Sequence, residues 1–380
     1  MSAFATLRRV DWWLFLVTAA LGLVSIAFLR STTLDDPRFE HQFGKQALFV
    51  ITALGIGFFC LLPHYRHVLR LAWVVYGAAV LGLLLLPVFG SVINGSRRWY
   101  ALPGFSIQPS EFAKIGVVVG LAALLRFERR VTIANSLLLP LLFAALPAGL
   151  VMVQPDLGSS LVFLPIALAM SYAAGARGRH VVLLVVVGLG AFVVAYFTAM
   201  HGYQKARIDV WAQHWTWDEN TRAVRELLRG PAYQPWQALI AMGSGGLTGF
   251  GLGQGPQNRY QFLPYRSEDY MFAVVGEETG WLGSMVVLLL YAALVIGLLA
   301  TAARTRERFG RLLCVGTAAW IGSQSLMHAA VCGWLVPATG LPMPLLSYGG
   351  SSVLATALAI ALCLNVGSRR EPVLAGDGYR

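Results

Sequence analysis

The amino-acid sequence predicts an all-α membrane protein with about ten transmembrane helices. Hydrophobic residues make up 57% of the 380-residue chain and charged residues only 12%, which is about half the charged share of an ordinary soluble protein. The apolar residues come in runs long enough to cross a bilayer as helices. Soluble folds are therefore excluded, and residues 1–380 are expected to form a single transmembrane domain.

The first apolar run, residues 12–29, follows Arg8 and Arg9 and is expected to remain as an uncleaved first span. It is long for a signal peptide, and no small-residue cleavage site precedes Arg30. The later runs each have a length that suits one crossing. The ten expected spans are residues 12–29, 47–62, 71–90, 110–125, 136–153, 158–175, 181–199, 270–299, 312–332 and 348–366.

Arginine residues are distributed unevenly over the connections between these spans. Every connection that follows an even-numbered span contains arginine, as at Arg66 and Arg70 or in residues 304–311. Basic residues gather on the cytoplasmic side of membrane proteins, so both termini are expected in the cytoplasm, including a short tail at about residues 367–380. The net charge of +11 comes from such short clusters and not from a continuous basic face, which argues against binding to nucleic acid.

The connection between the seventh and eighth spans, at about residues 200–269, is far longer than the others and is expected outside the cytoplasm. Long connections of this kind are usually functional. Its first half has helical spacing, and Trp211, Trp215 and Trp217 suit either a helix in the membrane interface or a cap over the bundle. Its second half, residues 243–255, is too rich in glycine for a helix and allows close approach of a ligand or neighbouring chain.

Acidic residues inside or beside apolar spans are costly and therefore suggest function. Asp269 opens the eighth span, and Ala273, Gly276 and Gly280 follow on the same helical face. These small residues are expected to leave a groove below the carboxylate that suits a lipid-linked substrate. A helix cap or close helix packing would explain the same pattern.

Two further groups of acids lie within spans. Glu111 and Lys114 are three residues apart and can pair on one helical face. This pair either fixes the helix, or Lys114 contacts a substrate phosphate while Glu111 positions it. Glu277 and Glu278 are expected to make buried polar contacts and to take no part in chemistry.

Motifs of several other membrane-protein classes are missing from the sequence. It has no Walker A motif, H-E-x-x-H or G-x-S-x-G, so ATP-driven transport and zinc proteolysis lack support. The four cysteines have no C-x-x-C spacing and lie in or beside apolar runs. Neither a disulfide framework nor a zinc site is therefore expected, and the cysteines are interpreted as buried apolar residues.

Five segments occur in an order that resembles the SEDS family, which includes RodA and FtsW, and the resemblance extends over about residues 45–370. The segments are NGSRRWYALPGFSIQPSEFAK (Asn94–Lys114), QPDLGSSL (Gln154–Leu161), MGSGGLTGFGLGQG (Met242–Gly255), FLPYRSEDYMFAVVGEETG (Phe262–Gly280) and GLPMPLLSYGGSS (Gly340–Ser352). The resemblance implies a peptidoglycan glycosyltransferase that polymerises lipid II at the outer face of the bacterial cytoplasmic (inner) membrane. Such a transfer inverts the anomeric centre and releases undecaprenyl diphosphate.

The same resemblance assigns the catalytic aspartate to Asp269. The family usually has His-Thr-Asp-Phe here, whereas this chain has Ser-Glu-Asp-Tyr, so a share of the role for Glu268 stays open. His328 stands where relatives usually have Asn. A divalent cation is an optional cofactor, because cations would stabilise the leaving group. The expected substrate-binding residues are Arg97, Arg98, Trp99, Gln108, Ser110, Glu111, Lys114, Asp156 and Ser347.

The resemblance leaves the cellular role open. Lys45-Gln46 and residues 154–158 favour RodA, the elongation and rod-shape enzyme, which is preferred here, whereas residues 94–96 and 251–253 favour the division enzyme FtsW. In either role the expected partner is a class B penicillin-binding protein that acts as transpeptidase. A lipid II flippase without chemistry is the main alternative function, and Asp35 or Asp36 is the alternative base.

Overall fold

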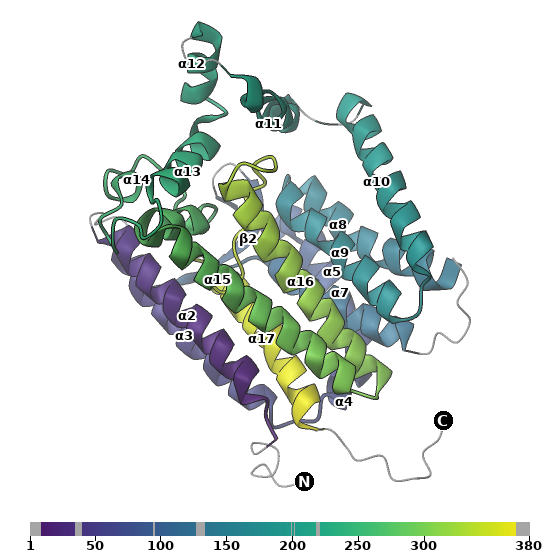
Figure 1. Ribbon diagram of the computed structural model, residues 1–380. Coiled ribbons are helices and arrows are strands. Elements are labelled where there is room, and N and C mark those ends of the chain that lie inside the picture. The colour runs from purple at the N-terminus through teal and green to yellow at the C-terminus, as the bar shows by residue number, and fades with distance from the viewer. Residues whose placement is uncertain are drawn as a thin grey trace, which may run out of the picture.

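The computed structural model is a bundle of helices that lie side by side (Figure 1). It describes residues 9–34, 40–93, 96–126, 134–198, 200, 202–217 and 221–369. The alternative base positions Asp35 and Asp36, and most of the expected C-terminal tail, lie outside the described residues.

A helix occupies each of the ten ranges in which a span is expected. These helices are α2 (Trp12–Thr33), α3 (Glu40–Cys60), α5 (Ala72–Leu84) with α6 (Leu86–Phe89), α7 (Pro109–Leu125), α8 (Leu139–Val153) after the π-helical turn η1 (Ala134–Leu138), α9 (Leu157–Ala173), α10 (Gly178–Thr198), α15 (Met271–Arg304), α16 (Arg308–Cys332) and α17 (Gly350–Ser368). Within the described residues, five of them, α2, α3, α10, α15 and α17, are long and apolar enough to cross a membrane. The predicted helical membrane protein is thus confirmed, while the number of spans stays a prediction.

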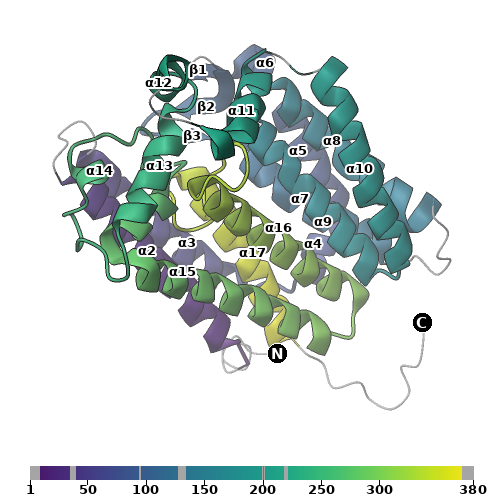
Figure 2. The same ribbon diagram turned by 45° about the horizontal axis from the view of Figure 1, so that its top comes forward.

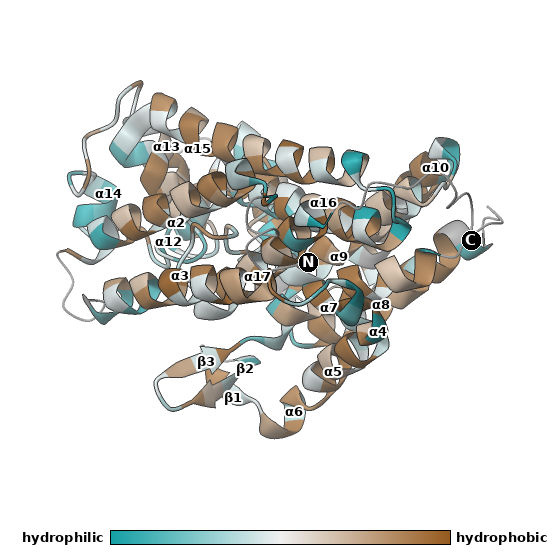
Figure 3. Ribbon diagram, turned by 90° about the horizontal axis from the view of Figure 1, so that it is seen from below, coloured by the Kyte–Doolittle hydropathy of each residue, from teal (hydrophilic) through white to brown (hydrophobic). Residues whose placement is uncertain are grey.

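Many large apolar side chains are exposed on the bundle, such as Leu23, Val74 and Val186. Hydrophobic colour runs along α2, α3, α5 and α15, and hydrophilic colour gathers near helix ends, as at α14 (Pro256–Arg259) (Figure 3). The first turn of α2 and the last turn of α17 lie at the same end of the bundle, opposite α11 (Gly202–Gln213), α12 (Arg222–Arg229) and α13 (Tyr233–Ser244) (Figure 1). This arrangement agrees with termini on one side and the long connection on the other.

A small antiparallel sheet, which an all-α prediction does not include, lies between α6 and α7. Its strands β1 (Ser91–Ile93), β2 (Ser96–Leu102) and β3 (Phe105–Ile107) pair in sequence order. Pro103 and Gly104 join β2 to β3, and Gly104 has a φ of 87°, which glycine adopts without strain. The sheet lies within an expected connection between two spans, so it adds to the helical fold without changing its class. The short helices α4 (Arg66–Arg70) and η2 (His214–Thr216) complete the fold.

The tryptophans of the long connection form a cap over the bundle. Trp334, in the connection between α16 and α17, is 1% exposed and packs with Trp211, Trp217 and Trp236 in a small separate core. Trp215 is the exception, because 66% of its surface is exposed. Of the two interpretations of this segment, capping of the bundle describes the contacts of Trp211 and Trp217.

The glycine-rich segment after α13 packs directly against α15. Gly280 has a φ of 65° and kinks α15, and a Cβ atom there would lie 2.5 Å from the backbone nitrogen of Gly249. A Cβ atom on Gly245 would lie 2.0 Å from the carbonyl oxygen of Gly276. The small residues of α15 therefore admit a neighbouring piece of chain. The prediction of an open groove below Asp269 is therefore wrong, because residues 242–249 occupy that space.

Candidate active site

One large cavity, of about 1260 Å³, lies at the end of the bundle that carries α11 and the sheet. Figure 2 shows this end, with α11, α13 and the strands around the connection between α16 and α17. The wall combines residues of that connection with residues of β2, α3, α9 and α11. Segments far apart in the sequence thus meet at one space, which is large enough for a small-molecule ligand.

Glu268 and Asp269 both line this cavity. Their backbone N–H groups each donate to the carbonyl oxygen of Tyr265 at 3.0 Å, which forms a tight turn before α15. The carbonyl oxygen of Ser267 accepts from the N–H of Tyr348 at 2.7 Å, so the turn is also fixed to the connection before α17. Neither carboxylate has a hydrogen-bond or ion-pair partner among the described residues.

The surroundings of these two acids favour their neutral forms. Burial, with the negative charge of Asp156 as a second cause, raises the pKa of Asp269 to about 6, although Arg207 and Arg98 act against the rise. Burial and the neighbouring Asp269 raise the pKa of Glu268 to about 7. Acids poised near neutral pH are suited to proton transfer, so this turn is the candidate catalytic element.

Asp156 is the third acid on the cavity wall and is held more firmly. Its carboxylate accepts from the N–H of Ser159 at 3.1 Å and so caps the start of α9. The side chain of Gln108 donates to it at 3.4 Å, and Arg98 Nη1 lies 4.0 Å away. Arg98 also donates from Nε to the carbonyl oxygen of Gln154 at 2.9 Å. Asp156, Arg98 and Gln108 therefore meet in the cavity, and Trp99 is a further residue on its wall.

Two cations on the wall were missing from the predicted site. Arg207 lies on α11 and donates to the carbonyl oxygen of Ala338 at 3.2 Å. Lys45 lies on α3 and has no acidic partner among the described residues. A sequence signal existed for both, since each is a cation near the outer end of an expected span or in the long connection. Only the folded chain shows that they share a space with Asp269.

Glu111 and Lys114 form the predicted pair but do not line the cavity. Lys114 Nζ lies 2.6 Å from Glu111 Oε1 and 2.9 Å from Gln324 Oε1, and neither member of the pair is exposed. The Lys114 ammonium also lies 5.3 Å from the ring centre of Trp320. Gln324 in turn donates to the carbonyl oxygen of Pro342, which is on the cavity wall. The pairing is confirmed, while a contact between Lys114 and substrate stays a prediction.

Three other expected substrate-binding residues also lie away from the cavity wall. Arg97 and Arg98 are neighbours on β2 and point to opposite faces, and Arg97 donates to the carbonyl oxygen of Pro87 at 2.7 Å. Ser110 is 2% exposed in the first turn of α7. Ser347 is 1% exposed, and its hydroxyl accepts from the N–H of Met343 at 2.9 Å.

His328 has a structural role that the sequence did not reveal. Its Nδ1 lies 2.7 Å from the carbonyl oxygen of Leu341, and its Nε2 accepts from the N–H of Phe272 at 3.4 Å. Donation from one ring nitrogen and acceptance at the other is the pattern of a neutral imidazole. His328 therefore ties the first turn of α15, just after Asp269, to the connection before α17.

The buried Glu277 and Glu278 make the polar contacts expected of them. Glu277 accepts from the N–H groups of Gln257 and Asn258 at 2.6 and 3.1 Å. Glu278 accepts from the Asn258 side chain at 2.6 Å and from the Ser31 hydroxyl. These contacts join α2, α14 and α15 and leave the two acids no access to the large cavity.

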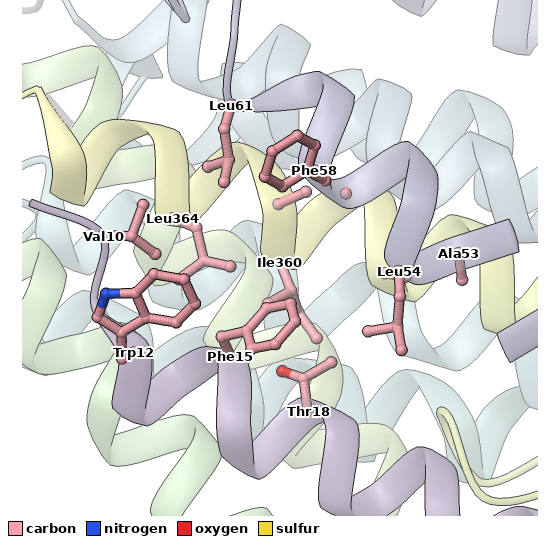
Figure 4. Close-up of a pocket in the computed structure, with 13 residues that line it drawn as sticks. Val10, Trp12, Phe15, Thr18, Ala53, Leu54, Phe58, Leu61, Ile360 and Leu364 are labelled. Atoms are coloured by element: carbon pink, nitrogen blue, oxygen red, sulfur yellow. The ribbon is translucent and has the colours of Figure 1, made fainter. Parts of the chain in front are cut away.

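A second pocket, between α2, α3 and α17, is small and apolar. Its volume is about 60 Å³, and Figure 4 shows Trp12, Phe15 and Leu364 around it. None of the described residues that line it is charged. Within the described part of the chain, no three His, Cys, Asp or Glu side chains are grouped so as to hold a metal ion. The large cavity is thus the better candidate for an active site.

The chain is similar to proteins of known families over nearly its whole length. The family model of FtsW, RodA and SpoVE, described as "Cell cycle protein", matches residues 8–371. A "Probable peptidoglycan glycosyltransferase FtsW" of Geobacter sulfurreducens is 30% identical over 379 residues, with 96% of each chain covered. "Stage V sporulation protein E" of Bacillus subtilis is 33% identical over 359 residues, with 92% of this chain and 94% of the relative covered.

Solved structures agree with this relationship. The rod shape determining protein RodA of Thermus thermophilus matches with a TM-score of 0.67 at 29% identity, over 94% of this chain and 96% of the other. A chain of a complex described as "Structural coordination of polymerization and crosslinking by a peptidoglycan synthase complex" matches with a TM-score of 0.78 at 28% identity, over 94% and 97% of the two chains. The protein therefore belongs to the SEDS family of FtsW, RodA and SpoVE.

Proposed function

We propose that this protein is a peptidoglycan glycosyltransferase that polymerises lipid II, with Asp269 as the general base. The single observation that carries the proposal is the state of Asp269 in its cavity. Its carboxylate has no partner among the described residues, lines a space of about 1260 Å³ and shares that space with Lys45, Arg98 and Arg207. An acid that has no partner among the described residues and lies beside several cations suits transfer of a sugar from a diphosphate.

In the proposed reaction a sugar hydroxyl of one lipid II attacks the anomeric carbon of another. Asp269 accepts the hydroxyl proton as the new C–O bond forms, a contribution worth roughly 10²–10⁴-fold in rate. The bond between the anomeric carbon and the diphosphate oxygen breaks, and its electron pair leaves with undecaprenyl diphosphate. Attack from the face opposite the leaving group inverts the anomeric centre.

The leaving group needs cations more than it needs an acid, because a diphosphate is already a good leaving group. Arg98 and Arg207 both lower the pKa of Asp269, so their charges act at the place where the carboxylate lies. Preorganised positive charge stabilises the negative charge that develops on the diphosphate. Glu268, whose pKa is raised by burial and by Asp269, is assigned no step.

The proposed placement is the bacterial cytoplasmic membrane, with the cavity facing outward and the termini inside. A class B penicillin-binding protein is the proposed partner, because a structural relative is described as part of a complex that coordinates polymerisation and crosslinking. Elongation is the preferred role. Division is the second candidate, since relatives at 30–33% identity carry the name FtsW. Complementation of rod-shape and division mutants separates these two roles.

Purified protein incubated with fluorescent lipid II tests the enzymatic proposal. We expect a ladder of glycan polymers, and more polymer after addition of the partner transpeptidase. Movement of lipid II between the leaflets of a vesicle, without any polymer under either condition, would instead establish the flippase alternative.

A further inference from the structure

Two acids on the cavity wall precede helices, and only one of them caps its helix. Asp156 precedes α9, and its carboxylate accepts from the N–H of Ser159, three residues further along the chain, at 3.1 Å. Asp269 precedes α15, and the N–H three residues further along belongs to Phe272. Acids are favoured at such positions because the first N–H groups of a helix lack acceptors within it. The carboxylate of Asp269 nevertheless has no hydrogen-bond partner among the described residues.

The N–H of Phe272 is taken instead by a side chain from another helix. His328, on α16, is 1% exposed, and its Nε2 lies 3.4 Å from the backbone nitrogen of Phe272. Its Nδ1 lies 2.7 Å from the carbonyl oxygen of Leu341. A carbonyl oxygen can only accept and an N–H can only donate, so Nδ1 carries the proton and Nε2 is the acceptor. His328 therefore supplies to α15 the cap that Asp269 does not supply.

His328 also holds the connection that passes the carboxylate. Gly340, directly before Leu341, has a φ of 66°, and a Cβ atom there would lie 3.6 Å from Asp269 Oδ2. The connection thus runs past the carboxylate, and the first turn of α15 follows the carboxylate in the chain. One imidazole bonds to both pieces of backbone, so it fixes them relative to each other.

We propose that His328 is a positioning residue, which caps α15 in place of Asp269 and thereby leaves the Asp269 carboxylate free in the cavity. This inference rests on the proposed function, because it concerns the carboxylate that acts there as the base. A carboxylate that accepts a backbone N–H is stabilised in its charged form and is a weaker base. Phe272 is 3% exposed, so without His328 its N–H would be a buried donor in need of an acceptor. The Asp269 carboxylate is the acceptor at the spacing that Asp156 uses.

Other groups also act on the ionisation of Asp269. Burial raises its pKa to about 6, the charge of Asp156 adds to the rise, and two arginines oppose it. Among the described residues, the charged and titratable groups that interact with Asp269 include Glu268, Tyr270, Arg98, Asp156, Arg207 and Cys332. A comparison of variants at position 328 leaves all of these groups in place. A difference in the pKa of Asp269 between such variants therefore reports the change at His328.

Titration of Asp269 in the purified full-length protein in detergent tests this inference without turnover. Infrared difference spectroscopy follows the C=O stretching band of the protonated carboxyl, and the spectrum of Asp269→Asn assigns the band. The wild-type midpoint should lie near the pKa of about 6. We expect His328→Leu to lower this midpoint by about one pH unit or more, because the freed N–H bonds to the carboxylate. His328→Gln should keep the wild-type midpoint, since its carboxamide oxygen can reach the position of Nε2 and accept from Phe272.

Tyr291→Phe is the matched control. The Tyr291 hydroxyl donates to the carbonyl oxygen of Pro344, so the change removes one bond to the same connection without touching Phe272. This variant should titrate as the wild type does. If it lowered the midpoint as far as His328→Leu, loosening of the connection would explain the shift and the inference would fail. Should His328→Leu not fold, His328→Met provides the comparison, because a thioether is only a weak acceptor.

Polymerisation of lipid II by the same variants separates this inference from the proposed function. At neutral pH we expect His328→Leu to be slower by about 10-fold or more and His328→Gln to be near the wild-type rate. An unchanged midpoint in His328→Leu, or an equal fall in His328→Gln, would overturn the inference even if the wild type polymerises lipid II. A lowered midpoint in His328→Leu with recovery in His328→Gln would support it even if the wild type makes no polymer.

Discussion

The acids within the bundle and the acids at its cavity have opposite surroundings. Glu111 contacts an ammonium at 2.6 Å, and Glu277 accepts two backbone N–H groups at 2.6 and 3.1 Å. Glu268 and Asp269 have no such partner among the described residues and face open space. Burial of an acid is therefore a weak sign of chemistry in this protein. An acid that the fold leaves without a partner beside a cavity is the stronger sign.

The largest effect on stability is expected at an acid within the bundle, Glu111. Glu111→Ala would leave Lys114 buried without its counter-charge, a change that costs about 3–5 kcal/mol in comparable pairs. We expect a large fall in folded yield and in the midpoint of thermal unfolding. Lys114→Ala should act similarly or more mildly. Normal yield and activity in both variants would show that the pair supports neither folding nor substrate binding.

Gly280→Ala should have the next largest effect, because the added Cβ atom would meet the backbone of Leu247 and Gly249. The φ of 65° at Gly280 costs an alanine about 1–3 kcal/mol, and the added Cβ atom would lie 2.5 Å from Gly249 N. Gly188→Ala on α10 is the matched control, since nothing lies within 4 Å of its Cβ position. Equal thermal stability of the two variants would contradict the close packing of residues 242–249.

Asp269, an acid at the cavity, should control the pH dependence of the reaction rate. Asp269 acts as a base only when ionised, and its pKa is raised to about 6. The rate with lipid II should therefore fall about tenfold per pH unit below pH 6 and level off above it. Because the charge of Asp156 contributes to this rise, Asp156→Asn should move the acidic limb to lower pH. A limb that does not move would mean that another group sets it.

Glu268→Gln should give the smallest change in stability. It should stabilise the protein, whereas Glu111→Ala should destabilise it. Burial raises the pKa of Glu268 from 4.5 to about 7, so the folded wild type loses stability as the pH rises through this interval. At pH 8 the free energy of unfolding of the variant should exceed that of the wild type by an amount on the order of 1 kcal/mol, which is measured as a higher midpoint of thermal unfolding. The difference should vanish at pH 4, and polymerisation should be largely retained.

The helices of this fold were predictable because apolar length alone determines where a chain can cross a membrane. The sheet was missed because β1 and β3 are only three residues each and lie among loop-forming residues. The groove below Asp269 was misjudged because small residues admit a neighbouring chain as readily as a ligand. Lys45 and Arg207 were missed for another reason: their proximity to Asp269 is a contact between distant segments, which spacing does not encode.

Polymerisation of lipid II by Asp269→Asn, measured beside Asp35→Asn and Asp36→Asn, tests the central claim most directly. Asparagine keeps the shape of the side chain but cannot accept the proton at neutral pH. We expect Asp269→Asn to fold and reach the membrane yet make almost no polymer, while the other two variants retain most activity. Polymer at the wild-type rate from Asp269→Asn, with loss in Asp35→Asn, would contradict the account and place the base in the first connection.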